Sequence, residues 1–383
     1  MHICLVYDCL FPWTVGGAER WYRNLGERLA AEGHRVTYLT LRQWDEPPKV
    51  TGIEVVAVGP RMALYEDGRR RIAPPLRFGV GVLAHLLAHG RRYDVVHTAS
   101  FPYFSLLAAG VARPLGGYRI VCDWHEVWSD GYWADYLGRL GPVGALVQRL
   151  CARVPQHAYA FSRLHAERLR ALGLADVTRL TGEYAGTASG PILPASSEPP
   201  TIVYAGRFIP EKRIDLLVEA LPLVREEIPD VRAQLIGSGP TLAAVQARLA
   251  ALGIEDWVEC PGFLPPEAVD EAMRSALCVV QPSSREGYGM VVIEAAARGV
   301  PAVVVAAPDN AATELVDEGR NGFIVADADP AALAAAIVRC RRGGEVLRAG
   351  TFAWYRANEE RLSLEGSLRT VSAGYKQDCV AAR

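Results

Sequence analysis

Lysine is almost missing from this chain of 383 residues. Of its 41 basic residues only Lys49, Lys212 and Lys376 are lysines, a bias that is typical of a GC-rich genome. A lysine kept beside a candidate site is therefore informative. The chain also lacks an excess of positive charge, because 43 acidic residues leave a formal net charge of -2. That balance gives no electrostatic reason to expect nucleic acid as a partner.

Paired cysteines and a targeting segment are absent as well. The eight cysteines include no C-x-x-C pair and are scattered at positions 4, 9, 122, 151, 260, 278, 340 and 379. Such scatter predicts reduced, mostly buried thiols rather than a disulfide frame or a zinc site. The first residues, MHICLVYD, read directly as a strand, with no charged leader or cleavage signal before them. We therefore expect a cytoplasmic protein.

No hydrophobic run is long enough to span a bilayer. The longest mainly apolar stretch near a helix is FGVGVLAHLLAHG, residues 78–90, and arginines flank it at 69–71, 91 and 92. An amphipathic helix that covers a sheet is the preferred interpretation. A helix that rests on the inner face of a membrane is the alternative, and it would make the protein peripheral to that surface.

Strand and helix patterns alternate through two halves of the chain, as in parallel βαβ units. In the first half we predict strands near 2–7, 35–40, 53–57, 94–97, 118–123 and 157–161, with helices at about 17–32, 75–89, 103–112, 142–153 and 162–172. In the second half the expected strands are 201–206, 233–237, 257–260, 278–282, 302–306 and 323–325. The length and the 50% content of hydrophobic residues suit two domains.

A segment rich in proline, serine, glycine and alanine, residues 186–200, has the composition of a linker between these halves. We predict an α/β protein with an N-terminal Rossmann-like domain at 1–187, a linker at 188–200 and a second Rossmann-like domain at 201–360. One or two helices end the chain. Open parallel sheets bind ligands at the carboxyl ends of their strands, so site residues are expected there in both halves.

The loop AGRFIPEKR combines two cations with a helix start. Gly206 ends a predicted strand, and Arg207 and Lys212 precede a helix near Ile214. A guanidinium, an ammonium and free helix amides together suit a diphosphate. Two solvated surface cations are the alternative interpretation.

Two glycine turns also follow predicted strands. Gly16 and Gly17 stand directly before a helix, where phosphate-binding turns occur, and Glu19 falls in its first turn. Gly237, in LIGSGP, lies where backbone can come close to a ligand, although by itself a plain turn is the better explanation. The full dinucleotide fingerprint is absent, which argues against an NAD enzyme.

The stretch VCDWHEVWSDGYW places His125 and Glu126 after a strand and among three tryptophans. Aromatic and polar groups together suit a sugar, and a hydrogen-bonded histidine in a partly buried loop is the alternative. His97, at the end of another strand, is interpreted as structural.

The segment REGYGMVVIEAAARGVP sets Glu286 and Glu294 eight positions apart across a glycine turn. On spacing alone, carboxylates near a helix N-terminus are most simply explained as stabilising the helix. With the other motifs in order, however, the chain resembles the retaining glycosyltransferases of family 4. Those enzymes have the GT-B fold of two facing Rossmann-like domains, and the segment resembles their E-x7-E element.

The resemblance implies roles for individual residues. Glu294 would accept hydrogen bonds from the ribose of a nucleotide, and Glu286 would face the donor sugar. The cations at 207 and 212 would neutralise the leaving diphosphate, so that no metal and no cofactor are needed. The catalytic assignments are Arg207, Lys212, Glu286 and His125. The assigned nucleotide-sugar site comprises Gly16, Gly17, Gly206, Gly237, Phe263, Gly287, Tyr288, Gly289, Met290, Val291 and Glu294.

The same resemblance implies a transferase that moves a hexose from a nucleoside-diphosphate sugar, UDP favoured over GDP or ADP, to an acceptor hydroxyl with retention. The acceptor stays open among a small natural product, a glycan, an inositol and a lipid-linked molecule. The last helix, from about 361 to 383, is expected to cross back to the N-terminal domain. Three departures from the family are LTGEYAG at 180–186, the glycine-free AAPDNAATELV at 306–316, and His125-Glu126 where relatives often have His-Asp.

Three other functions fit the same architecture less well. A phosphorylase would need a lysine for pyridoxal phosphate, and the second half offers only Lys212 and Lys376. A sugar-nucleotide epimerase would act without any acceptor. A non-catalytic sugar-nucleotide-binding protein would have little use for leaving-group cations.

Overall fold

A computed structural model of the chain describes residues 1–14, 16–46, 48–66, 69–186 and 199–381. It divides into two compact units, Met1–Thr181 with Glu365–Arg383 (unit 1) and Gly182–Leu364 (unit 2). The predicted domain limits are 187, where the structure has 181, and about 361, where the structure has 364. Residues 188–198 of the predicted linker lie outside the described residues.

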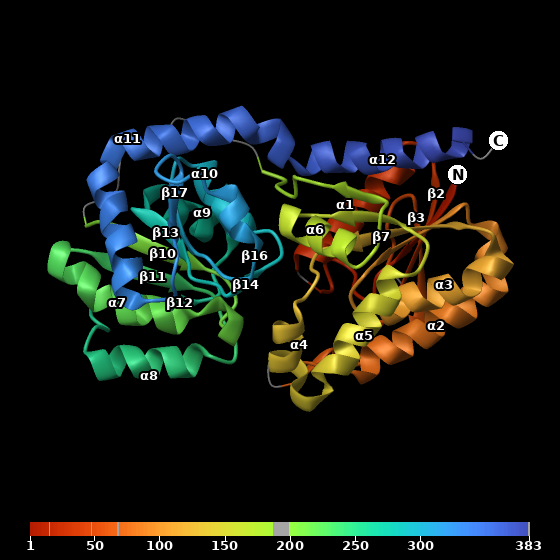
Figure 1. The fold of residues 1–383 in the computed structure, drawn as a ribbon, viewed down its shortest axis with the longest axis horizontal. Helices are drawn as coiled ribbons and strands as arrows, with labels where there is room; N and C mark the ends of the chain where they lie inside the picture. The colour runs from red at the N-terminus through yellow and green to blue at the C-terminus, as the bar shows by residue number, and fades with distance from the viewer. Residues whose placement is uncertain (15, 47, 67–68, 187–198, 382–383) are drawn as a thin grey trace. The chain divides into compact units, whose positions relative to one another are not determined.

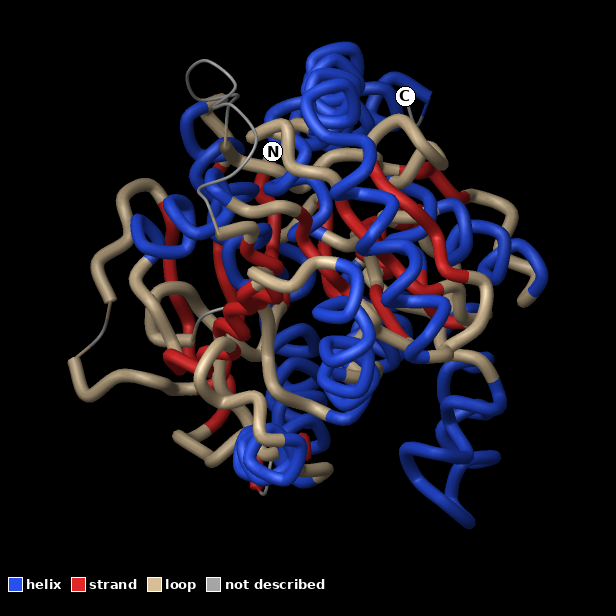
Figure 2. The backbone as a smooth tube through the Cα atoms, turned by 90° about the vertical axis from the view of Figure 1, so that its left-hand side faces the viewer, coloured by secondary structure: helices blue, strands red, loops and turns tan. Residues whose placement is uncertain are grey.

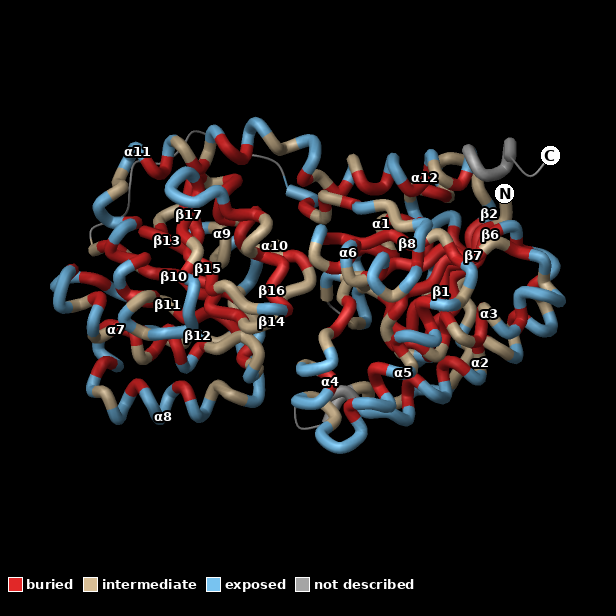
Figure 3. The backbone as a smooth tube through the Cα atoms, in the orientation of Figure 1, coloured by how far each residue is buried: buried red, intermediate tan, exposed pale blue. Residues whose placement is uncertain are grey.

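Unit 1 is built on a seven-stranded parallel sheet (Figure 1). Its strands are β1 (His2–Val6), β2 (Arg35–Leu41), β3 (Ile53–Gly59), β6 (Val95–Ala99), β7 (Arg119–Trp124), β8 (His157–Ala160) and β9 (Val177–Arg179). They lie in the order β3-β2-β1-β6-β7-β8-β9, and a short antiparallel pair, β4 (Tyr65–Glu66) and β5 (Arg69–Arg70), is separate. The central strands are almost wholly buried, as expected when helices cover both faces of a parallel sheet (Figure 3).

The helices of unit 1 flank this sheet. They are α1 (Gly17–Ala31), α2 (Ala73–His89), α3 (Phe104–Gly116), α4 (Asp130–Leu137), α5 (Gly141–Ala152), α6 (Arg163–Ala171) and α12 (Leu364–Ala381), with 3-10 turns η1 (Gly90–Arg92) and η2 (Gly138–Leu140). Helix α12 runs beside α1, while α2, α3 and α5 lie on the other side of the sheet (Figure 1). The sequence did not predict α4. No helix in the described part of the chain is long and apolar enough to cross a membrane.

Unit 2 repeats the architecture with six parallel strands in the order β12-β11-β10-β13-β15-β17. These are β10 (Thr201–Ala205), β11 (Arg232–Ile236), β12 (Val258–Gly262), β13 (Cys278–Gln281), β15 (Ala302–Val305) and β17 (Gly322–Val325). A two-stranded parallel pair, β14 (Arg285–Glu286) and β16 (Asp309–Asn310), stands apart from the sheet. The strands lie inside and the helices outside (Figure 2).

The helices of unit 2 include one long, broken helix. They are α7 (Ile214–Glu227), α8 (Leu242–Leu252), α9 (Pro266–Ser275), α10 (Met290–Ala296) and α11 (Pro330–Leu362), with 3-10 turns η3 (Pro210–Lys212) and η4 (Ala311–Leu315). Non-helical dihedral angles at Gly344 interrupt α11. Beyond α11 the chain enters α12, which packs in unit 1. The predicted α/β fold of two Rossmann-like domains and a returning C-terminal helix is thus confirmed.

Polar contacts fasten α12 to the core of unit 1. The Tyr375 hydroxyl contacts His97 Nδ1, and His97 Nε2 lies 2.9 Å from Asp123 Oδ1. His97 and Asp123 are fully buried. His97 thus joins two strands to the last helix, which is a structural role.

At the surface of the same helix, the Glu32 carboxylate accepts hydrogen bonds from Arg28, Ser372 and Lys376. Hydrogen bonds from Arg28 first, and then from Lys376 and Ser372, together lower the pKa of Glu32 to about 2, against the opposing effect of burial. Because this pKa lies below its unfolded value, the carboxylate stabilises the fold fully above about pH 4.5 and loses that effect as the pH falls toward 2.

Glu32→Gln is therefore expected to lower the free energy of unfolding by about 1 to 2 kcal/mol at pH 7. The deficit relative to the wild type should shrink by pH 3, since the wild-type carboxylate is then partly protonated. Urea unfolding followed by circular dichroism at the two pH values measures this. Glu27→Gln is the control, because Glu27 pairs only with Arg23 on the same helix among the interactions described. Equal costs for both variants would contradict the proposed anchoring of α12.

Candidate functional site

The sheet of unit 2 reverses its strand order between β10 and β13, which are hydrogen-bonded neighbours. In open α/β sheets, ligands bind at the carboxyl ends of strands beside such a reversal. The segments that follow these two strands are 206–212 and 282–286. Two stretches predicted from separate motifs therefore meet at the expected edge of the sheet.

The loop after β10 is held by backbone contacts. The buried Tyr204 hydroxyl donates to the Arg207 carbonyl at 2.9 Å, and the Arg207 side chain is exposed. Against this loop packs the turn after β11, where Gly237 has φ of +137°. A Cβ atom on Gly237 would lie 1.8 Å from the Gly206 carbonyl oxygen, so only glycine fits there. The predicted turn at Gly237 thus fixes the loop that carries Arg207.

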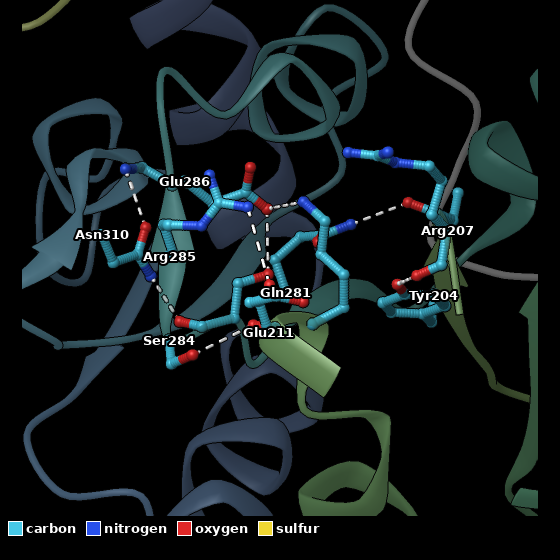
Figure 4. A network of polar contacts seen from close by, with 12 residues as sticks. Tyr204, Arg207, Glu211, Gln281, Ser284, Arg285, Glu286 and Asn310 are labelled. Atoms are coloured by element: carbon cyan, nitrogen blue, oxygen red, sulfur yellow. Dashed lines mark hydrogen bonds and ion pairs between the residues drawn. The ribbon is translucent and has the colours of Figure 1, made fainter. Parts of the chain in front are cut away.

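Lys212 and Glu286 form an ion pair across the two segments (Figure 4). Their side chains are only 17% and 15% exposed, so the pair is partly shielded from water. Ser283 Oγ donates to the same Glu286 oxygen at 2.9 Å. In the part of the chain that the structure describes, no hydrogen bond or ion pair joins Arg207 to either residue. The Lys212 ammonium and the Arg207 guanidinium therefore belong to one edge of the sheet without touching.

Several polar side chains that the sequence did not single out support this edge. Gln281 donates to the Ala205 carbonyl at 2.9 Å and so links β13 to β10. Asn310 Nδ2 donates to the Ser283 carbonyl at 2.9 Å. Asn310 lies in the glycine-free stretch 306–316. The departure of this stretch from the family pattern is the feature of the sequence that could have drawn attention to Asn310.

The glycine turn at 287–289 leads into α10, whose first residues are Met290 and Val291. Gly289 precedes the helix with φ of +105°, and a Cβ atom there would lie 2.7 Å from the Ala312 Cβ atom. Burial raises the pKa of the Tyr288 hydroxyl, whereas Met290 and Val291 are partly exposed. Position 289 is therefore restricted to glycine, and the turn is packed through the buried Tyr288.

Glu294 lies within α10 and is partly buried. Its main-chain carbonyl accepts from the Arg298 guanidinium at 2.5 Å, and Arg298 also pairs with Asp270. The contact to Arg298 does not use the Glu294 carboxylate. Removing that carboxylate should therefore leave the local main-chain bonding in place.

Phe263 follows β12, two strands away from the site's central reversal, and its side chain is 80% exposed. The preceding Gly262 carbonyl accepts from the Gly237 amide at 2.8 Å. The exposed ring therefore stands directly after a strand end that is tied to the Gly237 turn. An aromatic ring in that place is available for stacking.

Three further predicted residues, Gly16, Gly17 and His125, belong to unit 1. Gly16 is the N-cap of α1 in extended conformation, and Gly17 is the first residue of the helix. A Cβ atom on Gly16 would lie 2.3 Å from Glu19 Oε2, so the Glu19 carboxylate lies close against this turn. The turn thus presents main chain at the start of a helix of 15 residues, after β1 at the strand reversal of this sheet.

His125 follows β7, and its ring stacks on Phe161 with centroids 4.3 Å apart. Two positions earlier, the buried Asp123 accepts a 2.6 Å hydrogen bond from Trp21 Nε1. Burial raises the pKa of Asp123, but His97, His125 and Trp21 outweigh that effect and hold the pKa below its ordinary value. A buried carboxylate therefore anchors the strand end from which the His125 loop begins.

The fold and this sheet edge together define a protein of the GT-B class. The sequence model of the family "Glycosyl transferases group 1" matches residues 190–345, and the sequence model of "Glycosyltransferase Family 4" matches residues 15–181. A D-inositol 3-phosphate glycosyltransferase of Jonesia denitrificans is 31% identical over 404 residues, covering 96% of this chain and 92% of that protein. The chain belongs to the glycosyltransferases of family 4.

Other similarities are partial or distant. A GDP-mannose-dependent alpha-(1-6)-phosphatidylinositol monomannoside mannosyltransferase of Mycolicibacterium smegmatis is 32% identical over 145 residues, 36% of this chain and only 37% of that protein. The crystal structure of Anabaena HepE in complex with UDP superposes with a TM-score of 0.75. It covers 98% of this chain and 100% of its own, at 16% identity, which supports the fold alone.

Proposed function

We propose that the chain is a retaining hexosyltransferase that uses a nucleoside-diphosphate sugar without a metal. The observation that carries the proposal is the pairing of Lys212 with Glu286 beside Arg207 at the β10–β13 reversal. A diphosphate at this edge would meet two cations, and the donor sugar would meet a carboxylate. Such electrostatic complementarity acts most strongly where charge develops as the leaving group departs.

The proposed reaction takes place on one face of the sugar. The acceptor oxygen bonds to the anomeric carbon as the bond from that carbon to the diphosphate breaks, and the departing phosphate oxygen takes the acceptor's proton. Lys212 and Arg207 neutralise the diphosphate. Glu286, already bonded to Lys212 and Ser283, orients the ammonium and faces the sugar. The charge on Glu286 stabilises the positive charge that develops at the anomeric carbon.

The proposed nucleotide and acceptor rest on two residues of the site and on the names of similar proteins. The Glu294 carboxylate would accept from the ribose hydroxyls, and Phe263 would stack on the base. The UDP complex of HepE supports UDP, while the mannosyltransferase name keeps GDP as the alternative. Inositol occurs in the names of both relatives, which supports a polyol hydroxyl as acceptor. We place the reaction in the cytoplasm.

The stereochemical outcome tests the retaining mechanism without knowledge of the acceptor. With an α-linked UDP-hexose and no acceptor, slow hydrolysis by water should release the α anomer first. Proton NMR of the anomeric signal follows this before mutarotation. Initial release of the β anomer would show inversion and contradict the mechanism.

Activity should also be unchanged by excess EDTA. The nearest approach to an Asp-x-Asp element is ADADP at 326–330, between β17 and the start of α11. There the Asp329 side chain accepts from Ala332 N at 2.8 Å as an N-cap. The same NMR assay with chelator, and with magnesium or manganese added back, measures the effect. Activity that disappears with EDTA and returns only with metal would contradict the assignment of the cationic role to Arg207 and Lys212.

A further inference from the structure

Unit 1 exposes an unusual number of aliphatic side chains on one side. Of the fourteen large apolar side chains that are exposed among the described residues, ten lie on α2, α3 and α5 or directly before them. None of the ten is aromatic. Helices α2 and α3 are in contact, as are α3 and α5, and all three lie on the side of the sheet opposite α12 (Figures 1 and 3). We call the outward side of these three helices the α2–α3–α5 face.

The exposed side chains form stripes along each helix. Val143, Leu146 and Leu150 recur at helical spacing on α5 and are 55%, 52% and 41% exposed. On α2 the exposed Val80 stands opposite the buried Val82, so that α2 is apolar toward the core and toward solvent alike. A helix that only covers a sheet would carry polar residues on its outer side. Helix α2 therefore covers the sheet, as predicted, and in addition presents apolar side chains to solvent.

Positive charge predominates on this face. The stretches 68–93, 95–122 and 136–166, which contain the three helices, make up more than a fifth of the chain and hold none of its 43 acidic residues. Exposed arginines stand among the apolar side chains, with Arg77 on α2 and Arg113 on α3, while Arg149 on α5 is paired with Asp130 of α4. Arg139 and Arg153 flank α5 and are also exposed. In a chain of net charge -2, this face is both apolar and positive.

We propose that the α2–α3–α5 face binds the surface of an anionic lipid bilayer. Aliphatic side chains would enter the boundary between headgroups and acyl chains, and the arginines would meet the lipid phosphates. A second copy of the chain fits less well, because two such faces would bring like charges together. Nucleic acid fits less well because none of the exposed side chains described on this face is an aromatic ring that could stack on bases. The proposal does not depend on the proposed transferase activity.

Co-sedimentation of the full chain with vesicles tests this surface. The protein should sediment with vesicles of phosphatidylcholine mixed with phosphatidylglycerol, and much less with phosphatidylcholine alone. Added salt should weaken the binding. The double variant Val143→Asp, Leu146→Asp should weaken binding to the anionic vesicles by a factor of about ten or more. The matched control is Leu223→Asp, Val346→Asp, which alters two exposed apolar residues of unit 2 and should bind as the wild type does.

Melting temperature and UDP affinity of each variant show that the fold is intact. A second, more conservative variant, Arg113→Gln with Arg153→Gln, should reduce anionic-vesicle binding even if the aspartate pair fails to fold. The proposal is overturned if the wild type binds neither kind of vesicle, or if the face variants bind as tightly as the control. It is also overturned if the aspartate pair only converts a dimer to a monomer in size-exclusion chromatography.

Discussion

Arg207→Ala is expected to lower kcat by a factor of about 100 to 1,000 and to change KM for the sugar nucleotide little. The guanidinium matters most when the diphosphate departs, so its loss raises the transition state more than the bound ground state. Only the exposed side chain is removed, because Tyr204 holds the loop through the Arg207 carbonyl. Steady-state kinetics of donor hydrolysis measure both constants.

Arg248→Ala provides the control for general loss of positive charge. Arg248 is a surface arginine of the same unit, is paired with Glu219, and lies on α8, which is not part of the loops after β10 and β13. Its variant should keep wild-type turnover. If Arg207→Ala keeps more than about a third of wild-type turnover, Arg207 does not neutralise the leaving group.

Glu294→Ala is expected to weaken nucleotide binding more than about a hundredfold. Two ribose hydroxyl bonds to a charged acceptor contribute roughly 3 kcal/mol. The bond from Arg298 reaches the main-chain carbonyl and therefore survives the substitution. Isothermal titration calorimetry with UDP measures the affinity, and a thermal melt of the same sample measures stability.

The helix-stabilising interpretation of Glu294 makes the opposite prediction. It requires a lower melting temperature with unchanged UDP affinity, because the carboxylate would then interact only with the helix. Glu219→Ala on α7 is the matched control, since it removes a helical glutamate far from the glycine turn in sequence and should leave UDP affinity unchanged.

The fold could be predicted because parallel βαβ units leave a local signal. Alternation of β-branched runs with helical stretches located every strand of the two main sheets except β9, and the positions of Arg207, Lys212 and Glu286 at strand ends followed from it. The strand order then brings the segments after β10 and β13 together, although 74 positions separate Lys212 from Glu286. Motifs at strand ends are thus informative before any contact is known.

Contacts that depend on register and packing could not be predicted in this way. Gln281 reaches the Ala205 carbonyl across 76 positions, and Tyr375 reaches His97 across 278. Nothing in the local sequence around these residues specifies a partner. The exposed stripe on α5 was missed for a related reason, since a helical pattern shows which residues share a side but not which side faces the sheet.

The most direct test of the donor site is a thermal melt with UDP, GDP, ADP or TDP in excess EDTA. A ligand at a hundred times its Kd adds about 2.7 kcal/mol to the stability of the folded state. We expect UDP to raise Tm by about 5 °C or more and to do so without metal, while Glu294→Ala loses the shift at the same concentration. If none of the four nucleotides raises Tm, or if Glu294→Ala responds as the wild type does, the loops after β10 and β13 are not a nucleotide-sugar site.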